Sequence, residues 1–234
     1  MQNQIPVPIA FDKERASSYD KKFAAMAPMR DALHLLTRAI LSELPAESRI
    51  LCVGAGTGTE IIDLAQAFPK WQFTAVEPSA PMLNICRQRV EENSLTSRCT
   101  FHEGYLDSLP TCEPFDAATS LLVSQFIMQT EERHSFFRQI ATRLCLGGIL
   151  VSADLTSDMS TATYHSLLEI WLRLLRACDI PAEEIENMRA SFGRSVATLP
   201  PQEVESILAS SGFEAPILFL QALLIHAWYA KRTS

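Results

Sequence analysis

The chain contains no long uncharged apolar run and no cluster of basic residues, and each absence excludes a class of protein. Charged residues interrupt its apolar stretches well short of the roughly 20 residues that a membrane-spanning helix needs. The 20 Lys and Arg residues are outnumbered by 27 Asp and Glu residues, which gives a formal net charge of -7. Nucleic-acid binding needs clustered Lys and Arg, so we expect neither a membrane nor a nucleic acid partner.

Closely spaced cysteines are also missing. The six cysteines are scattered and form no C-x-x-C pair: Cys52, Cys86, Cys99, Cys112, Cys145 and Cys178. This pattern argues against a bound metal and against a disulfide framework. The first ten residues contain two prolines and lack the basic and then apolar pattern of a secretion signal. We therefore expect a reduced, cytoplasmic setting.

The most informative stretch is RILCVGAGTGTE, residues 49–60. Residues 50–53 predict a buried parallel strand, and residues 60–68 carry apolar side chains at helical spacing. Three glycines, Gly54, Gly56 and Gly58, lie between them. Glycine adopts backbone angles closed to other residues and lets a ligand approach the main chain, while the following helix presents free N–H groups. A nucleotide-like ligand is expected at this turn.

The spacing of the glycines separates two cofactor classes. A dinucleotide-binding fingerprint reads G-x-G-x-x-G, whereas here the third glycine comes one position early and Thr59 takes its place. The motif VGAGTGTE resembles the first motif of class I S-adenosylmethionine-dependent methyltransferases of the small-molecule type. That resemblance implies S-adenosylmethionine as cofactor, with the loop of Gly54, Ala55, Gly56, Thr57 and Gly58 beneath its methionine part.

The next strands extend the resemblance. Residues 71–76 predict a second strand that ends in Glu77, and a carboxylate at the tip of that strand can accept both ribose hydroxyls. AVEPSAPML resembles the second motif of the family, which implies roles for Pro78 and for Met82 on the adenine. Residues 98–102 predict a third strand, followed by Gly104, Tyr105 and Leu106. Family members often have Gly-Asp here, so Tyr105 is a departure from the pattern and implies a different adenine contact.

Two further strands complete the cofactor edge. Residues 115–121 predict the fourth strand, after which Leu121 and Leu122 are expected beside the sulfonium. Residues 131–146 predict a helix that Gly147 and Gly148 stop before a strand over residues 149–153. LCLGGILVSADL resembles the late motif of the family and places Asp154 at the carboxyl end of a central strand, the edge where ligands bind in open α/β sheets.

These elements predict a single α/β domain. Its core would be a Rossmann-like, doubly wound, seven-stranded and mostly parallel sheet, closed by an antiparallel edge hairpin from residues 213–220 and 222–231 after a helix over residues 201–211. We divide the chain into an N-terminal helical cap (1–47), a cofactor-binding core (48–155), a helical lid (156–199) and a C-terminal part (200–234).

The cap carries two predicted cofactor residues. Residues 12–43 have helical character with a break at Pro28. The segment resembles the N-terminal cap of small-molecule methyltransferases, which implies that Tyr19 contacts the methionine end. Arg30 stands where those proteins have a second Tyr. The guanidinium group of an arginine can bind the cofactor carboxylate through two parallel hydrogen bonds. The alternative is that Arg30 is a solvent-exposed helix residue.

The lid is the expected place for the methyl acceptor. Four arginines are candidates to hold an acidic acceptor: Arg173, Arg176, Arg189 and Arg194. We select Arg194, in a turn after Gly193, and also Asp154 as substrate-binding residues. A general base is needed only for a poor nucleophile, and Asp154, His134 and His165 are the candidates, so the catalytic residue is left open between them.

The sequence thus predicts methyl transfer from S-adenosylmethionine to a small molecule by a monomer or homodimer without a metal. Two alternatives stay open. A nicotinamide-dependent oxidoreductase is disfavoured by Thr59 and by the lack of a Tyr-x-x-x-Lys pair. A non-catalytic, S-adenosylmethionine-binding regulatory protein is disfavoured by the predicted lid.

Overall fold

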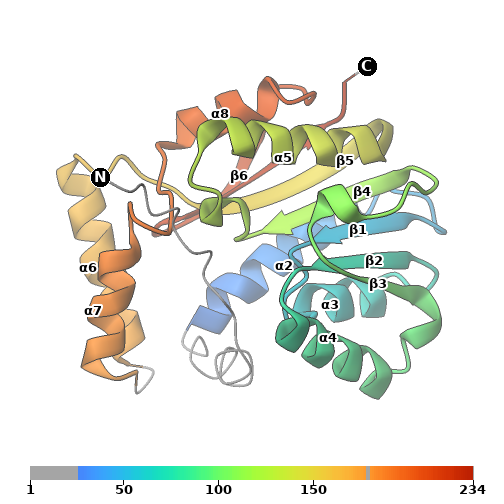
Figure 1. The fold of residues 1–234 in the computed structure, drawn as a ribbon, viewed down its shortest axis with the longest axis horizontal. Coiled ribbons are helices and arrows are strands. Elements are labelled where there is room, and N and C mark those ends of the chain that lie inside the picture. Colours follow the sequence, from blue (N-terminus) through green and yellow to red (C-terminus); the bar gives the residue numbers. More distant parts are fainter. Residues whose placement is uncertain (1–25, 178–179, 234) are drawn as a thin grey trace.

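A computed structural model describes residues 26–177 and 180–233 (Figure 1). Seven strands form one sheet in the order β3-β2-β1-β4-β5-β7-β6. Strands β1 to β5 run parallel, and β7 is antiparallel to both β5 and β6. The strands are β1 (Arg49–Val53), β2 (Gln72–Glu77), β3 (Cys99–Glu103), β4 (Phe115–Leu121), β5 (Leu144–Leu155), β6 (Ile217–Ala222) and β7 (Ile225–Lys231). The predicted seven-stranded sheet with an antiparallel edge hairpin is confirmed.

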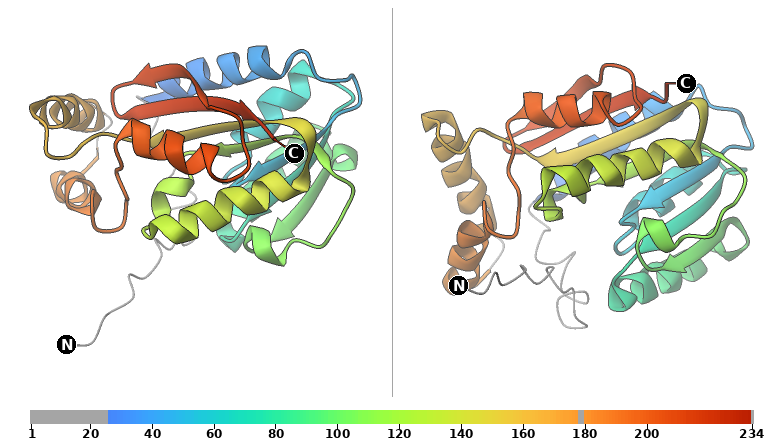
Figure 2. Two further views of the ribbon diagram at one scale, coloured as in Figure 1. Left: turned by 90° about the horizontal axis from the view of Figure 1, so that it is seen from above. Right: turned by 45° about the horizontal axis from the view of Figure 1, so that its top comes forward.

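Helices cover both faces of the sheet (Figures 1 and 2). One face carries α2 (Ala27–Leu41), α3 (Thr59–Ala67) and α4 (Ala80–Glu92), and the other carries α5 (Thr130–Arg143) and α8 (Pro201–Ala209). Short 3₁₀ helices lie in the connections between strands, namely η2 (Thr96–Arg98), η3 (Leu106–Ser108) and η4 (Ser124–Phe126). Because successive strand residues point to opposite faces, Leu51 packs under α5 while Ile50 packs under α3.

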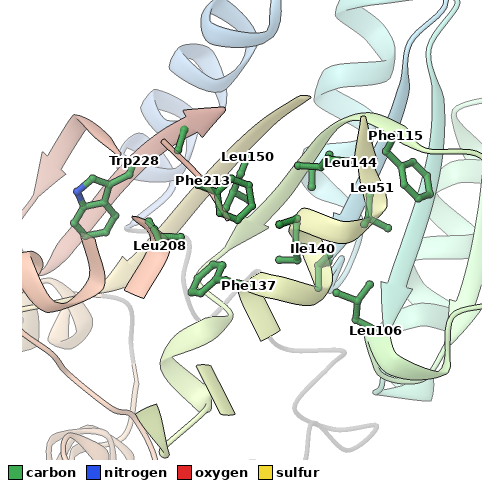
Figure 3. Packing of buried hydrophobic residues seen from close by; sticks show 14 of the residues in the cluster. Leu51, Leu106, Phe115, Phe137, Ile140, Leu144, Leu150, Leu208, Phe213 and Trp228 are labelled. Atoms are coloured by element: carbon green, nitrogen blue, oxygen red, sulfur yellow. The ribbon is translucent and has the colours of Figure 1, made fainter. Parts of the chain in front are cut away.

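The larger core lies between the sheet and the helices α5 and α8 (Figure 3). Phe137 and Ile140 of α5 are completely buried against Leu51 and Leu150 of the sheet. Trp228 of β7 is equally buried, and its indole N–H donates to Glu205 Oε1 at 2.9 Å. This packing holds the central strands in register, so that their carboxyl ends meet at one edge.

Two helices, α6 (Ala162–Arg176) and α7 (Ala182–Ser191), project beyond that edge as a separate pair (Figures 1 and 2). Their apolar faces form a third cluster around Trp171, which also includes Met26 at the start of α2. The insertion leaves and rejoins the core at one place, because the Ser157 N–H donates to the Leu199 carbonyl at 2.9 Å.

The junction between α5 and β5 differs from the prediction. The expected helix over residues 131–146 ends at Arg143, and β5 begins at Leu144. The two glycines therefore lie inside the strand, where the pairing of β4 with β5 shifts register. A Cβ on Gly148 would meet the Cys145 carbonyl at 2.9 Å, so Gly148 is required by the irregular strand and not by a helix end.

The last two strands also begin later than predicted. The turn between them is formed by Leu223, which has a φ of 55°, and Leu224, which is completely buried. Both leucines pack with the α6–α7 cluster, and the Leu224 carbonyl accepts from the Thr156 N–H at 2.8 Å. An apolar turn is stable here because the insertion covers it.

Pro28 is the second residue of α2, which begins at Ala27. It lies in the first turn of α2, where the missing N–H of proline costs no hydrogen bond. The part of the predicted cap that precedes Met26, including Tyr19, lies outside the described residues. None of the described helices is both long and apolar enough to cross a membrane.

Phe137→Ala tests the contribution of α5 to the core. Removing this completely buried ring is expected to lower the free energy of unfolding by about 3–5 kcal/mol in urea titrations. Leu146→Ala is the control, because Leu146 is 68% exposed and its loss should change stability by no more than about 0.5 kcal/mol. Equal effects of the two substitutions would contradict the assignment of the core.

Candidate functional site

The loop between β1 and α3 is held against the neighbouring strand by its own backbone. The N–H groups of Gly54 and Ala55 both donate to the Val76 carbonyl of β2, at 2.8 and 3.1 Å. Gly54, Gly56 and Gly58 have φ values of 71°, 53° and 80°. These left-handed conformations explain why the turn contains three glycines.

The three glycines meet three different surroundings. A Cβ on Gly54 would lie 2.4 Å from Val123 Cγ2, and a Cβ on Gly58 would lie 2.6 Å from Cys86 Sγ on α4. Those two glycines allow close packing of the protein on itself. A Cβ on Gly56 would meet nothing nearer than Met82 Cε at 3.9 Å. Gly56 is therefore the position where the loop faces free space that a ligand can fill.

Glu77, at the carboxyl end of β2, completes this cradle. Its two carboxylate oxygens accept from the N–H groups of Gly56 and Ser79, each at 2.9 Å. Burial raises the pKa of Glu77, and these two backbone N–H groups act against that rise. An ionised carboxylate has about four acceptor positions, so two hydrogen bonds leave it able to accept ribose hydroxyls. An adenosyl cofactor fits the open face of Gly56 and the spare acceptors of Glu77.

The other predicted adenine contacts lie around this pair. Met82 is buried beside Gly56, and Pro78 is exposed. After β3, the Gly104 N–H donates to the Glu77 carbonyl at 3.2 Å, the Tyr105 side chain is 61% exposed, and the Leu106 side chain points into the core. Tyr105 is thus free to cover a ligand, whereas Leu106 offers only its main chain.

The segment after β4 closes the other side of the loop. Leu122 has a φ of 61°, which is unusual for a leucine, and its N–H donates to the Ala153 carbonyl at 2.7 Å. This turn directs Val123 onto Gly54. Leu121 and Leu122 are both partly buried next to the loop, on the side away from Glu77. Backbone strain of this kind concentrates at functional sites.

Asp154 belongs to a buried polar network at the end of β5. It is completely buried, and its oxygens accept from Ser124 Oγ at 2.7 Å and from the Gln125 N–H at 2.9 Å. Burial raises the pKa of Asp154, and the charge of nearby Arg133 acts against that rise. In this arrangement Asp154 positions the backbone after β4, and it would reach an acceptor only if the network opened.

Arg133 is a residue that sequence reasoning missed. It is 1% exposed, and it donates through Nε to the Ser124 carbonyl at 2.8 Å and through Nη2 to the Ala197 carbonyl at 3.1 Å. Ala197 also donates its N–H to the Gln125 carbonyl at 2.7 Å. Arg133 therefore ties the start of α5 and η4 to the segment that returns from the α6–α7 insertion.

The remaining candidates are more dispersed. Arg30 pairs with Asp31 at 3.0 Å, and Arg194 is exposed after Gly193, whose φ is 74°. His165 is exposed on α6, whereas His134 hydrogen-bonds with Ser210 and Ser211 beside α8. Arg189 is paired with Glu169 at 2.8 Å and Glu186 at 3.3 Å.

The rest of the described structure was searched for a metal site and for other cavities. Within residues 26–177 and 180–233, no group of three or more His, Cys, Asp or Glu side chains is arranged to hold a metal ion. A depression of about 410 Å³ lies at the opposite edge of the sheet, beside the start of β4 and the end of α5. No predicted site residue lines it.

Comparison with known proteins assigns the cradle to a family. Residues 50–148, which contain the glycine loop, Glu77 and the turn after β4, match the family model described as "Methyltransferase domain". The chain contains a class I S-adenosylmethionine-dependent methyltransferase domain. This finding decides against the nicotinamide-dependent alternative, and S-adenosylmethionine is the cofactor of the family.

Two curated relatives are similar to this chain over alignments of different length. A release factor glutamine methyltransferase of Rhodopirellula baltica is 32% identical over 102 residues, which are 41% of this chain and 34% of that protein. A carboxy-S-adenosyl-L-methionine synthase of Campylobacter lari is 23% identical over 205 residues, which are 87% of this chain and 86% of that protein. The chain thus spans about a third of the first relative and most of the second.

Solved structures share the fold. An O-methyltransferase family 2 protein of Planctomyces limnophilus, solved in complex with apigenin, superposes with a TM-score of 0.60 at 16% identity. The similarity covers 94% of this methyltransferase chain and 62% of that protein. At this identity the likeness concerns the fold alone.

Gly56→Ala tests whether this glycine faces the cofactor. The added methyl group has room in the ligand-free protein, so we expect a folded variant that loses measurable S-adenosylhomocysteine binding in calorimetry. Gly147→Ala is the matched control, because Gly147 likewise has a left-handed φ, of 74°, and room for a Cβ, but lies in β5 away from the loop. Equal loss of binding in both variants would contradict the assignment.

Glu77→Ala tests the ribose contact. Its loss should weaken binding of S-adenosylhomocysteine by roughly 1.5–3 kcal/mol, the range for hydrogen bonds to a charged group. Glu103→Ala provides the comparison, since Glu103 is the register partner of Glu77 on β3 and is exposed. Unchanged affinity in purified Glu77→Ala protein would overturn the role of Glu77.

Proposed function

We propose that this chain transfers a methyl group from S-adenosylmethionine to a small-molecule acceptor. The observation that carries the proposal is the open face of Gly56 beside the buried carboxylate of Glu77, within the residues that match the methyltransferase model. The proposed cofactor-binding residues include the glycine loop, Glu77 and Met82 at that point, whereas Arg30 pairs with Asp31 on α2 and Tyr19 lies outside the described residues.

A small acceptor is supported by charge and by the insertion. The net charge of -7 disfavours a nucleic acid, and α6 and α7 stand beyond the carboxyl ends of the strands, where an acceptor must approach. The P. limnophilus protein of the same fold was solved with a small aromatic molecule, apigenin. A cytoplasmic location and a monomeric or homodimeric state are part of the same proposal.

The residues of this site can accelerate the reaction by positioning the acceptor relative to the methyl group. When bound, S-adenosylmethionine supplies an electrophilic methyl group. The protein would hold the acceptor in line and exclude water, which is an effective source of acceleration for a displacement in which charge is lost. Asp154 is engaged in its network and His165 is exposed, so we assign neither the role of a general base in this conformation.

Incubation with S-adenosylmethionine and a library of small acids, amines, thiols and phenols tests the proposal. We expect release of S-adenosylhomocysteine together with one acceptor that gains a methyl group, both detected by mass spectrometry. Cofactor binding without any product from the whole library would favour the non-catalytic alternative. Failure to bind S-adenosylmethionine or S-adenosylhomocysteine would contradict the proposal itself.

One observation favours a second candidate function. The similarity to the C. lari carboxy-S-adenosyl-L-methionine synthase extends over 87% of this chain and includes the insertion, whereas the similarity to the R. baltica protein covers 41%. The chain would then form carboxy-S-adenosylmethionine: one of the supplied acids would lose its carboxyl group as carbon dioxide, and this carbon would bond to the S-methyl carbon of S-adenosylmethionine, which loses a proton. The same mass spectrometry distinguishes this outcome, because the carboxyl group would appear on the S-adenosyl compound and not on an acceptor.

Arg194→Ala tests the proposed acceptor contact. If Arg194 binds an acidic acceptor, its loss should lower kcat/KM by about tenfold or more while the affinity for S-adenosylhomocysteine stays unchanged. Arg138→Ala on the exposed side of α5 is the control. An unchanged kcat/KM would show that Arg194 is an ordinary surface residue without a role in acceptor binding.

A further inference from the structure

The sheet ends in two edge strands, β3 and β6, which differ in how they meet solvent. β3 ends in the exposed Glu103, and the guanidinium group of Arg87 on α4 lies 5.4 Å from the centre of the Phe101 ring. Charged side chains at an edge strand hinder its pairing with another chain. β6 reads ILFLQA and contains no charged residue, and Pro216 precedes the strand without interrupting it. The β6 edge therefore lacks the protection that β3 has.

β6 also exposes large apolar side chains on both faces of the sheet. Ile217 is 52% exposed and Leu218 is 44% exposed. Ile217 is paired with Tyr229, which packs with residues of α2 and α3. Leu218 is paired with Trp228, which packs under α5 and α8. Because directly paired residues point to the same face, the two exposed side chains lie on opposite faces of one edge.

The outer flank of α2 continues this apolar surface. α2 lies beside β6, and its Leu33 clusters with Leu220 (Figure 2). One flank of the helix faces α3, because Arg38 pairs with Asp63 at 3.3 Å. Helical spacing places Leu36 on the opposite flank, toward the free side of β6, and this leucine is partly exposed. The edge strand and the helix above it thus present one apolar side.

These features define what can cover the edge. Every second residue of an edge strand points its N–H and C=O groups away from the sheet, so a covering strand has to pair with them. That strand has to be uncharged, because burying an unpaired charge is costly. It also has to offer apolar side chains on both faces. A second copy of β6 meets all three conditions.

We propose that two copies of this chain associate through β6 and double the seven-stranded sheet. The two strands pair antiparallel about a two-fold axis perpendicular to the sheet. This axis keeps both α2 helices on one face, so the flanks that carry Leu36 approach each other. An extended peptide in the same place would present a new unpaired edge, whereas the symmetric dimer leaves only the charged β3 edges. The proposal does not depend on the chemistry of the cofactor site.

Light scattering after size-exclusion chromatography tests the association of the full chain. The wild type should have twice the chain mass of 26.1 kDa. Leu218→Lys should have the mass of the monomer, because an ammonium group from each copy would be buried at the strand contact without a partner. Leu218 is exposed within one copy, so the variant should keep the circular dichroism spectrum of the wild type.

Two control variants locate the contact. Thr100→Lys places the same charge on the other edge strand, and Leu146→Lys places it at an exposed apolar position near the start of β5. Both should stay dimeric. A wild type that is monomeric at about 100 µM, where a dimer of micromolar affinity is formed, would overturn the proposal and leave β6 to a different partner. A dimeric Leu218→Lys variant or a monomeric Thr100→Lys variant would also overturn it.

Hydrogen exchange of the wild type provides a readout without any substitution. Pairing of two β6 strands protects their outward N–H groups, so the peptide that covers residues 217–222 should exchange more slowly at about 100 µM than at about 1 µM. The peptide that covers β3 should exchange equally at both concentrations. Protection that appears at β3, or no concentration dependence at β6, would contradict the proposed contact.

Discussion

The hydrogen bond from the Gly56 N–H to the Glu77 carboxylate fixes the glycine loop and the carboxyl end of β2 relative to each other. Gly56 belongs to the loop after β1, and Glu77 ends the neighbouring strand β2. The bond holds the carboxylate at the sheet edge while it turns the open face of Gly56 outward. The parallel pairing of β1 with β2 and β4 brings the carboxyl ends of these strands together around this pair.

Local sequence patterns predicted the elements that carry strong local signals. The fourth strand has the predicted bounds, 115–121, because its apolar residues are buried on both faces and turn residues flank it. The glycine loop and the terminal acid of β2 were likewise readable, since each depends on a backbone conformation or a strand end.

Features that depend on distant contacts could not be read in the same way. Arg133 follows two glutamates and precedes a histidine, a pattern typical of an exposed helix start, yet its side chain is buried by η4 and by the segment around Ala197. The different surroundings of the three loop glycines could not be predicted from the sequence either. It depends on Val123 and Cys86, which lie far from the loop in the sequence.

The buried charges of this edge differ in how they are compensated. Asp154 has Arg133 nearby and accepts two hydrogen bonds, from Ser124 and Gln125, while Arg133 Nη1 is buried without a hydrogen-bond partner in the described part of the chain. Among the described residues, Glu60 accepts a hydrogen bond from the Thr119 hydroxyl and forms no ion pair. The arrangement around Asp154 is suited to holding the fold.

The hydrogen bond between Ser157 and Leu199 brings the two ends of the α6–α7 insertion together at one point of the core. The exposed parts of the insertion can therefore change without moving any strand, provided that its apolar face keeps its contacts with Leu155, Leu224 and Ile225. Selection for a new acceptor can therefore act on α6 and α7 while the cofactor cradle stays unchanged. One scaffold of this kind can acquire many acceptors through changes confined to about one fifth of its length.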